Sequence, residues 1–244
     1  MSDRNTSLVD TDVSWDAAYD VARKCYRRLV DRGVILPVLR SDVCLSRVAF
    51  PVREDYRGFD RLNDLPSDAP CGSGIVGGGE RINPNIYPVV ERLEIHVVGF
   101  HWQHDAAGAV TLQPDAVGEP SAEGLFFNIE GGFRANCPHC STSIELGGDE
   151  TERLDDALTT WCKASMASKG QTTLQCPRCN SVASLQAWRS REQDFAAGYV
   201  GLTLWGQHLL TLTYQPDHPA NKPAWEALCG DMADPSPAIV YCNI

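Results

Sequence analysis

Two short cysteine motifs of the same form constrain this chain more than any other feature of its sequence. They occupy residues 137–140 (Cys-Pro-His-Cys) and 176–179 (Cys-Pro-Arg-Cys). Two residues between paired cysteines let both sulfurs face one metal ion from a single tight turn, so two such pairs supply four tetrahedral ligands. The spacing therefore predicts one structural zinc site, whose ligands are Cys137, Cys140, Cys176 and Cys179.

Three other uses of these cysteines are open: disulfides, a redox-active C-x-x-C site, and buried thiols without a chemical role. A thioredoxin-like redox motif occurs once, at the start of a helix in a βαβ pattern, whereas this motif occurs twice. Four thiolate ligands complete the coordination shell of zinc and leave no open position for water. We therefore expect the metal to be structural and not catalytic.

The residues around the two motifs resemble the zinc-ribbon module over residues 133–189, and no whole-chain family is recognised. The resemblance implies that each cysteine turn lies at the tip of a β-hairpin, and that the role lies between nucleic-acid binding and plain scaffolding. Zinc ribbons usually carry glycine after the second cysteine, where the backbone needs a positive φ, but this chain has Ser141 and Asn180. Because Asn adopts this conformation more readily than Ser, the first turn departs further from the pattern.

The segment between the motifs is about twice as long as usual, and its excess predicts a helix over about residues 151–168. Asp149 and Glu152 can form a capping box, and Gly170 can end the helix. Its apolar stripe contains Leu154, Leu158, Trp161, Cys162 and Met166. We expect this stripe to dock on the rest of the chain; a partner protein is the alternative.

The remaining sequence predicts an α+β fold with a mainly antiparallel sheet, because its apolar runs are joined by short links. An amphipathic helix is expected from Ser14, as its cap, to Arg32, and a short helix with Pro223 in its first turn follows Pro216. Residues 105–124 are expected to form a surface loop. Strands are expected at residues 34–36, 48–50, 89–103, 125–129, 199–205, 209–214 and 238–242.

Three regions follow from this order of elements. Residues 1–132 form an N-terminal α+β region, residues 133–189 form the zinc-ribbon insertion with its helix, and residues 190–244 supply C-terminal strands and a helix that complete the main domain. Cys25, Cys162 and Cys229 fall on apolar helix stripes, where we expect them to pack as small hydrophobic residues.

The balance of charge restricts the partners. The chain has 21 basic and 32 acidic residues, a net charge of −11, which opposes binding to phosphate backbones and anionic lipids. Its one dense basic stretch, residues 23–28, lies on the polar side of the first predicted helix. The first residues lack the apolar core of a signal peptide, and no run approaches the length of a membrane span, so we expect a cytosolic protein without a membrane partner.

A catalytic thiol is the main alternative to a scaffold. Residues 71–73 (Cys-Gly-Ser) look like the start of the papain-type signature, and His96, His101 and His104 are candidate bases for Cys71. The next residues depart from that signature. The glycine string at 72–77 also matches a dinucleotide-binding pattern, but it lacks the flanking strand and helix. His101 and His104 could supply two metal ligands without an evident third.

Three functional classes follow. We favour a non-enzymatic protein-binding protein of the bacterial cytosol, whose acidic surface engages another protein; it could serve as an immunity protein, the antidote that masks a basic toxin. The second class is a thiol enzyme built on Cys71. The third is a nucleic-acid-associated accessory protein that uses the ribbon, which the net charge of −11 disfavours.

Overall fold

The structure, a computed structural model, describes residues 4–41, 48–56, 59, 90–115, 122–128, 132–148, 151–206, 222–233 and 237–243. Several sequence-based predictions lie outside the described residues. They are the glycine-rich segment with Cys71, the proposed capping residue Asp149, and the strand expected at 209–214.

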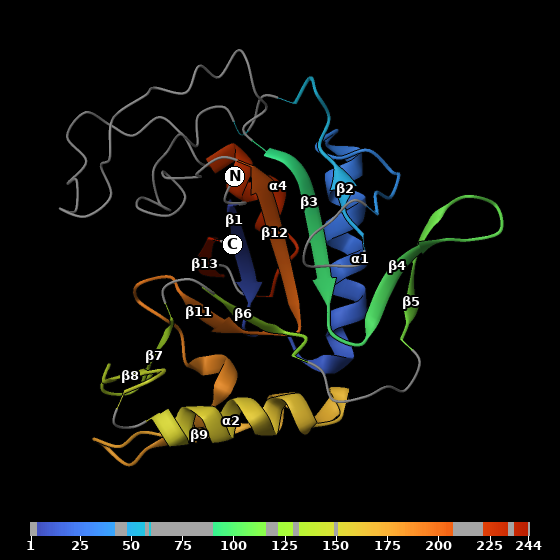
Figure 1. Cartoon of the computed structure of the whole chain (residues 1–244). Helices are drawn as coiled ribbons and strands as arrows, with labels where there is room; N and C mark the ends of the chain where they lie inside the picture. The colour runs from blue at the N-terminus through green and yellow to red at the C-terminus, as the bar shows by residue number, and fades with distance from the viewer. Residues whose placement is uncertain are drawn as a thin grey trace, which may run out of the picture.

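An antiparallel sheet of seven strands forms the centre of the molecule (Figure 1). Its strand order is β13-β1-β12-β3-β4-β5, and β2 also pairs with β3. With the helices described below, this arrangement confirms an α+β fold with a mainly antiparallel sheet. The strands are β1 (Arg4–Asp10), β2 (Phe50–Pro51), β3 (Val90–Val97), β4 (Phe100–His104), β5 (Val110–Pro114), β12 (Val200–Gly206) and β13 (Ala238–Asn243).

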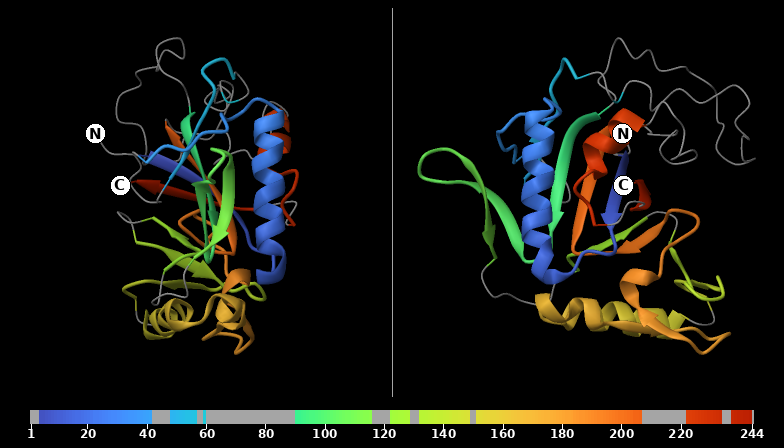
Figure 2. Two further views of the ribbon diagram at one scale, coloured as in Figure 1. Left: turned by 90° about the vertical axis from the view of Figure 1, so that its right-hand side faces the viewer. Right: turned by 180° about the vertical axis from the view of Figure 1, so that it is seen from behind.

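Helix α1 (Trp15–Asp31) covers one face of this sheet, as the left view of Figure 2 shows. Alternate strand residues face it, among them Leu8, Leu93 and Leu202, and they share a buried core with Ala18, Ala22 and Leu29 of the helix. Each such leucine contributes about 1.5–3 kcal/mol by leaving water. The helix matches its predicted range. Ser14 occupies the N-cap position, but its side chain makes no capping hydrogen bond.

The cysteine motifs belong to a second group of elements, which lies beyond one end of the sheet (Figure 1). Their side chains form a separate buried core that includes Phe133, Trp161 and Trp188. The elements of this second group are β6 (Leu125–Phe127), β7 (Arg134–Asn136), β8 (Ser143–Glu145), α2 (Thr151–Lys163), the 3-10 helices η2 (Met166–Gln171) and η3 (Leu185–Ala187), β9 (Thr173–Gln175), β10 (Val182–Ser184) and β11 (Phe195–Ala197). Near the sheet lies α4 (Lys222–Cys229), the predicted short helix.

Helix α2 docks on the rest of the chain, as expected for its apolar stripe. Leu154, Ala157 and Trp161 are buried. The Trp161 indole donates a hydrogen bond of 2.8 Å to the Glu123 carbonyl, and its ring lies 6.1 Å from that of Tyr199. Two details of the prediction were wrong. The α-helix ends at Lys163 and a separate 3-10 helix, η2, begins at Met166, and Cys162 is only half-buried.

Two predictions about the sheet were also wrong, and one strand was not predicted. The long strand expected over residues 89–103 is two strands, β3 and β4, because Gly99 turns the chain with φ +74°. The loop expected over 105–124 contains strand β5. Strand β1 was missed, although it pairs with both β12 and β13.

The predicted division at residues 133 and 189 stays a prediction. The core around the cysteine motifs also takes in Phe127 and Phe195, which lie on either side of that segment. Cys25 and Cys229 are buried, as expected. Within the described residues, no helix has the length and apolar character needed to cross a membrane.

Replacing Gly99 by alanine tests the turn between β3 and β4. A Cβ there would lie 2.8 Å from the Trp15 ring. Gly108 is the matched control, because it also has a positive φ but has no atom within 4 Å of its Cβ position. We expect Gly99→Ala to lower the free energy of unfolding by about 1–3 kcal/mol more than Gly108→Ala in urea titrations, the usual range for overpacking. Equal losses would contradict this steric account.

Candidate metal centre

The two cysteine turns have the same backbone hydrogen bonds. In the first, the Cys137 amide donates to the Thr142 carbonyl at 2.8 Å, and the Ser141 amide donates to the Cys137 carbonyl at 2.9 Å. In the second, the corresponding donors are Cys176 and Asn180, at 2.9 and 3.0 Å. The first turn joins β7 to β8 and the second joins β9 to β10, so each motif lies at the tip of a hairpin, as the resemblance implied.

Both turns contain a left-handed residue directly after the second cysteine. Ser141 has φ 62° and Asn180 has φ 57°. These are the positions where ribbons usually carry glycine, so the backbone requirement is met here without it. A left-handed conformation costs a residue with a Cβ about 1–2 kcal/mol. At Ser141 the Arg191 guanidinium donates a hydrogen bond of 2.5 Å to the hydroxyl, which helps to hold the turn.

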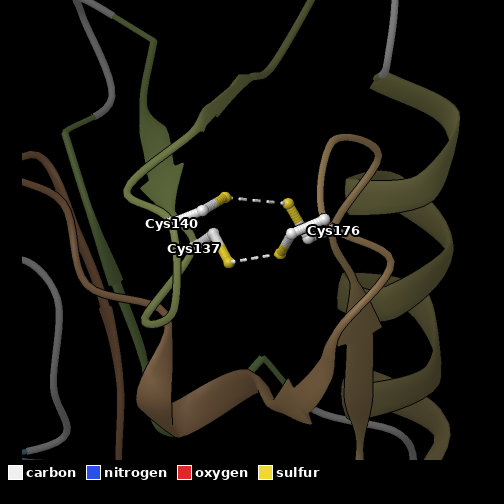
Figure 3. A group of neighbouring side chains, drawn as sticks. Cys137, Cys140 and Cys176 are labelled. Carbon is white, nitrogen blue, oxygen red and sulfur yellow. Dashed lines mark hydrogen bonds between the residues drawn. The ribbon is translucent and has the colours of Figure 1, made fainter.

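The turns bring the four sulfurs together, and Figure 3 shows the two hairpin tips facing each other. All four Sγ atoms lie within 4.8 Å of one another. The Sγ–Sγ distance is 3.8 Å between Cys137 and Cys179 and 3.5 Å between Cys140 and Cys176. Zinc–sulfur bonds of about 2.3 Å in a tetrahedron require sulfurs about 3.8 Å apart. The donor set therefore fits one tetrahedral ion.

Hydrogen-bond donors around the sulfurs favour their thiolate forms. The His139 amide donates to Cys137 Sγ at 3.4 Å, and Ser181 Oγ lies 2.9 Å from Cys179 Sγ. Hydrogen bonds with Thr142 lower the pKa of Cys140 to about 6. Burial instead raises the pKa of Cys176 to about 11. A dication would favour the thiolate at all four positions, and acid would compete with it for the sulfurs.

The cluster is buried on one side and open on the other. Cys137 and Cys176 are buried, Cys140 is half-buried, and Cys179 is exposed. A metal could therefore enter past Cys179. Four sulfurs leave no open position for a substrate, so the chemistry that this site supports is structural.

The histidines proposed as bases or metal ligands have other partners. His96 Nε2 lies 3.3 Å from a Glu94 carboxylate oxygen, and His101 Nδ1 lies 2.7 Å from Asp115 Oδ1. His104 Nδ1 lies 3.1 Å from the Gly108 carbonyl oxygen. Within the described ranges, the four cysteines form the one cluster of three or more His, Cys, Asp or Glu residues suited to a metal ion.

Sequence reasoning missed the two hydroxyl side chains that support the sulfurs. Thr142 and Ser181 each stand two residues after the last cysteine of their motif. Thr142 contacts Cys140, and Ser181 contacts Cys137 and Cys179. The repeat of a hydroxyl residue at the same position in both motifs is the signal that could have identified them.

Comparisons of the chain with protein-family models, curated proteins and solved structures found no match. The likeness to zinc ribbons therefore rests on the local geometry of the cysteine turns.

Replacement of one cysteine tests the cluster as a metal site. We expect Cys176→Ser to lose most of its bound metal, measured by elemental analysis, and to lower the melting temperature by more than about 10 °C, because structural zinc contributes directly to folding. Cys162→Ser is the matched control, since Cys162 is half-buried and lies outside the cluster. Equal metal content in the two variants would refute the site.

The supporting hydroxyls give a second test. Loss of such a partner typically weakens metal affinity about 10–100-fold. We expect Thr142→Val to show this loss in a competition titration with a chromophoric chelator. Ser143→Ala serves as its control, because Ser143 is exposed and contacts none of the sulfurs. An unchanged affinity in Thr142→Val would show that the hydrogen bond to Cys140 does not tune the site.

Proposed function

We propose that the four cysteines hold one structural Zn²⁺ ion, and that the chain is a non-enzymatic binding protein whose fold depends on that ion. The observation that carries the metal assignment is the sulfur spacing of 3.5 and 3.8 Å. Soft thiolate ligands in a tetrahedron suit zinc, or iron as the less common alternative. Zinc bound this way supplies structural cross-linking and no open site for chemistry.

The ion would join two hairpins that the sequence keeps apart. One pair of ligands comes from the β7–β8 tip and the other from the β9–β10 tip, and α2 lies between them in the chain. Beneath the hairpins lies the second core, with Trp161 and Trp188 at its centre. Removal of the ion would free both tips, so the docking surface of α2 would loosen as well.

Binding to a basic protein is the role that we propose for the acidic surface. The net charge is −11, and the solvent side of α2 carries exposed Glu152, Asp155 and Asp156. Complementary charge raises association rates and selects against acidic partners. The specific form of this proposal is a bacterial cytosolic immunity protein that masks a basic toxin. The described cysteines form no disulfide, which agrees with a reducing compartment.

The salt dependence of binding tests the proposed partner. A pull-down from the native host should return one dominant basic protein, and its association rate should fall steeply between 50 and 200 mM salt, about tenfold or more. Neutralising Glu152, Asp155 and Asp156 together should reduce this rate. The control neutralises Asp16, Asp20 and Asp31, which are exposed on α1. An acidic partner, or a rate independent of salt, would contradict the proposal.

A further inference from the structure

The sheet face opposite α1 carries polar side chains where a packed core would carry apolar ones. The strand register places Ser7 of β1 beside Thr203 of β12, and Thr203 beside Glu94 of β3. Asn5 lies two residues before Ser7, and His96 two residues after Glu94, on the same face. We call Asn5, Ser7, Thr203, Glu94 and His96 the polar row.

Strand β6 covers only part of this face. The Phe126 ring lies over Gly201, where it leaves no room for a Cβ, and it meets the His96 ring edge-on at 5.5 Å. Beyond this cover lies a hollow of about 470 Å³, lined by Asn5, Ser7, Thr203 and His96 of the polar row. The volume falls within the range of about 300–1,000 Å³ that small ligands occupy.

Two members of the polar row are buried without the hydrogen bonds that their atoms require. Glu94 is 1% exposed; its one ion-pair partner in the described chain is His96 at 3.3 Å, and neither carboxylate oxygen accepts a hydrogen bond there. Asn5 is 4% exposed, and its amide nitrogen has no acceptor within the described residues. Unsatisfied buried groups each cost about 1–3 kcal/mol of stability. Stability alone therefore does not account for these two side chains. A ligand oxygen in the hollow could accept from Asn5, which lines it, and a cation there would offset the charge of Glu94, which lies behind the lining residue His96.

The charges around the hollow select the kind of ligand. Its described lining includes the carboxylates of Asp115 and Glu123 and contains no Lys or Arg. Asp115 is paired with His101. Arg92, two residues before Glu94, lies over the Trp205 ring at 4.7 Å and is not among the residues that line the hollow. An anion would meet carboxylates here, whereas a cation would gain a charged partner.

The aromatic walls of the hollow suit a cation whose charged group is carried on an aliphatic chain. Phe100, Phe126 and Tyr199 line it beside the polar groups. Aromatic faces attract ammonium and guanidinium groups and pack against their aliphatic stems. The polar floor and the aromatic walls thus suit one end of a slender amphipathic cation.

We propose that this hollow binds an ammonium or guanidinium group on a slender stem. The lining carboxylate of Glu123 is the direct counter-ion for the cation. Glu94, which pairs with the lining residue His96 but does not itself line the hollow, adds negative charge behind it. The Asn5 amide donates to an oxygen of the same ligand. Two sources share this chemistry: a free amine such as arginine, and the basic side chain of a peptide. The site is built on the main sheet and not on the cysteine hairpins, so it goes beyond the proposed zinc-dependent function.

The test compares arginine with citrulline, its neutral isostere, by isothermal titration calorimetry of the full chain. We expect L-arginine or the tripeptide acetyl-Gly-Arg-Gly-amide to bind at least about tenfold tighter than its citrulline counterpart, the size of one charge-assisted contact. Binding by free arginine assigns a small-molecule ligand. Binding by the tripeptide alone assigns a basic side chain of a partner.

Substitutions locate the binding within the hollow. Glu94→Gln should lower the binding affinity for the cationic probes at least about tenfold. Glu91→Gln should leave the affinity unchanged, because Glu91 is exposed and alternates to the other face of β3. If Glu94→Gln does not fold, Glu123→Gln decides, since loss of this lining carboxylate should also weaken binding. Equal affinity for arginine and citrulline, no binding of either cationic probe at millimolar concentration, or unaltered affinity in the Glu variants would overturn the proposal. Cys176→Ser tests the zinc proposal separately.

Discussion

The convergence of four sulfurs on one point is the constraint on which the second half of the structure depends. Two hairpin tips meet with sulfurs 3.5 and 3.8 Å apart, and between them in the chain lies α2, so the helix and both hairpins must share one arrangement. Each turn accepts a left-handed residue with a Cβ at Ser141 or Asn180. Such local strain is tolerated where the surroundings fix the backbone, and a metal ion shared by the two turns would fix it in this way.

Buried and partly buried hydrogen bonds hold this unit together and connect it to the main sheet. Trp161 donates to the Glu123 carbonyl, and the Tyr199 hydroxyl accepts from the Gly170 amide at 2.6 Å. Gln186 donates to the Thr11 carbonyl at 3.2 Å, between β1 and α1. Within the unit itself, the buried Lys169 ammonium of η2 donates to the Trp161 carbonyl of α2 at 2.8 Å. These polar groups lose water on folding, so each one left without its partner costs free energy. Disorder at the cysteine hairpins would remove such partners, and we therefore expect it to destabilise the neighbouring part of the sheet as well.

Much of the fold followed from sequence patterns that have a direct physical cause. Helix α1 was evident from its apolar stripe, the four clustered sulfurs from the spacing of the cysteines, and the hairpins from the resemblance of the two motifs to zinc ribbons. Strand β1 was not, because Asn5, Thr6 and Ser7 are polar and break the alternation that marks a strand. The structure gives the reason: Asn5 and Ser7 face the hollow and not the core.

The break at Gly99 was missed because the apolar run of the sequence continues through it. Glycine is required there by the packing of Trp15, a residue far away in the sequence. The metal cluster could be predicted locally; the polar row could not, because it forms only when β1, β12 and β3 pair.

X-ray absorption spectroscopy at the metal edge of protein purified without chelators tests the central claim most directly. The account predicts one zinc ion per chain with four sulfur ligands at about 2.3 Å. Nitrogen or oxygen ligands in the first coordination shell, or a fully folded chain without a stoichiometric metal, would contradict it.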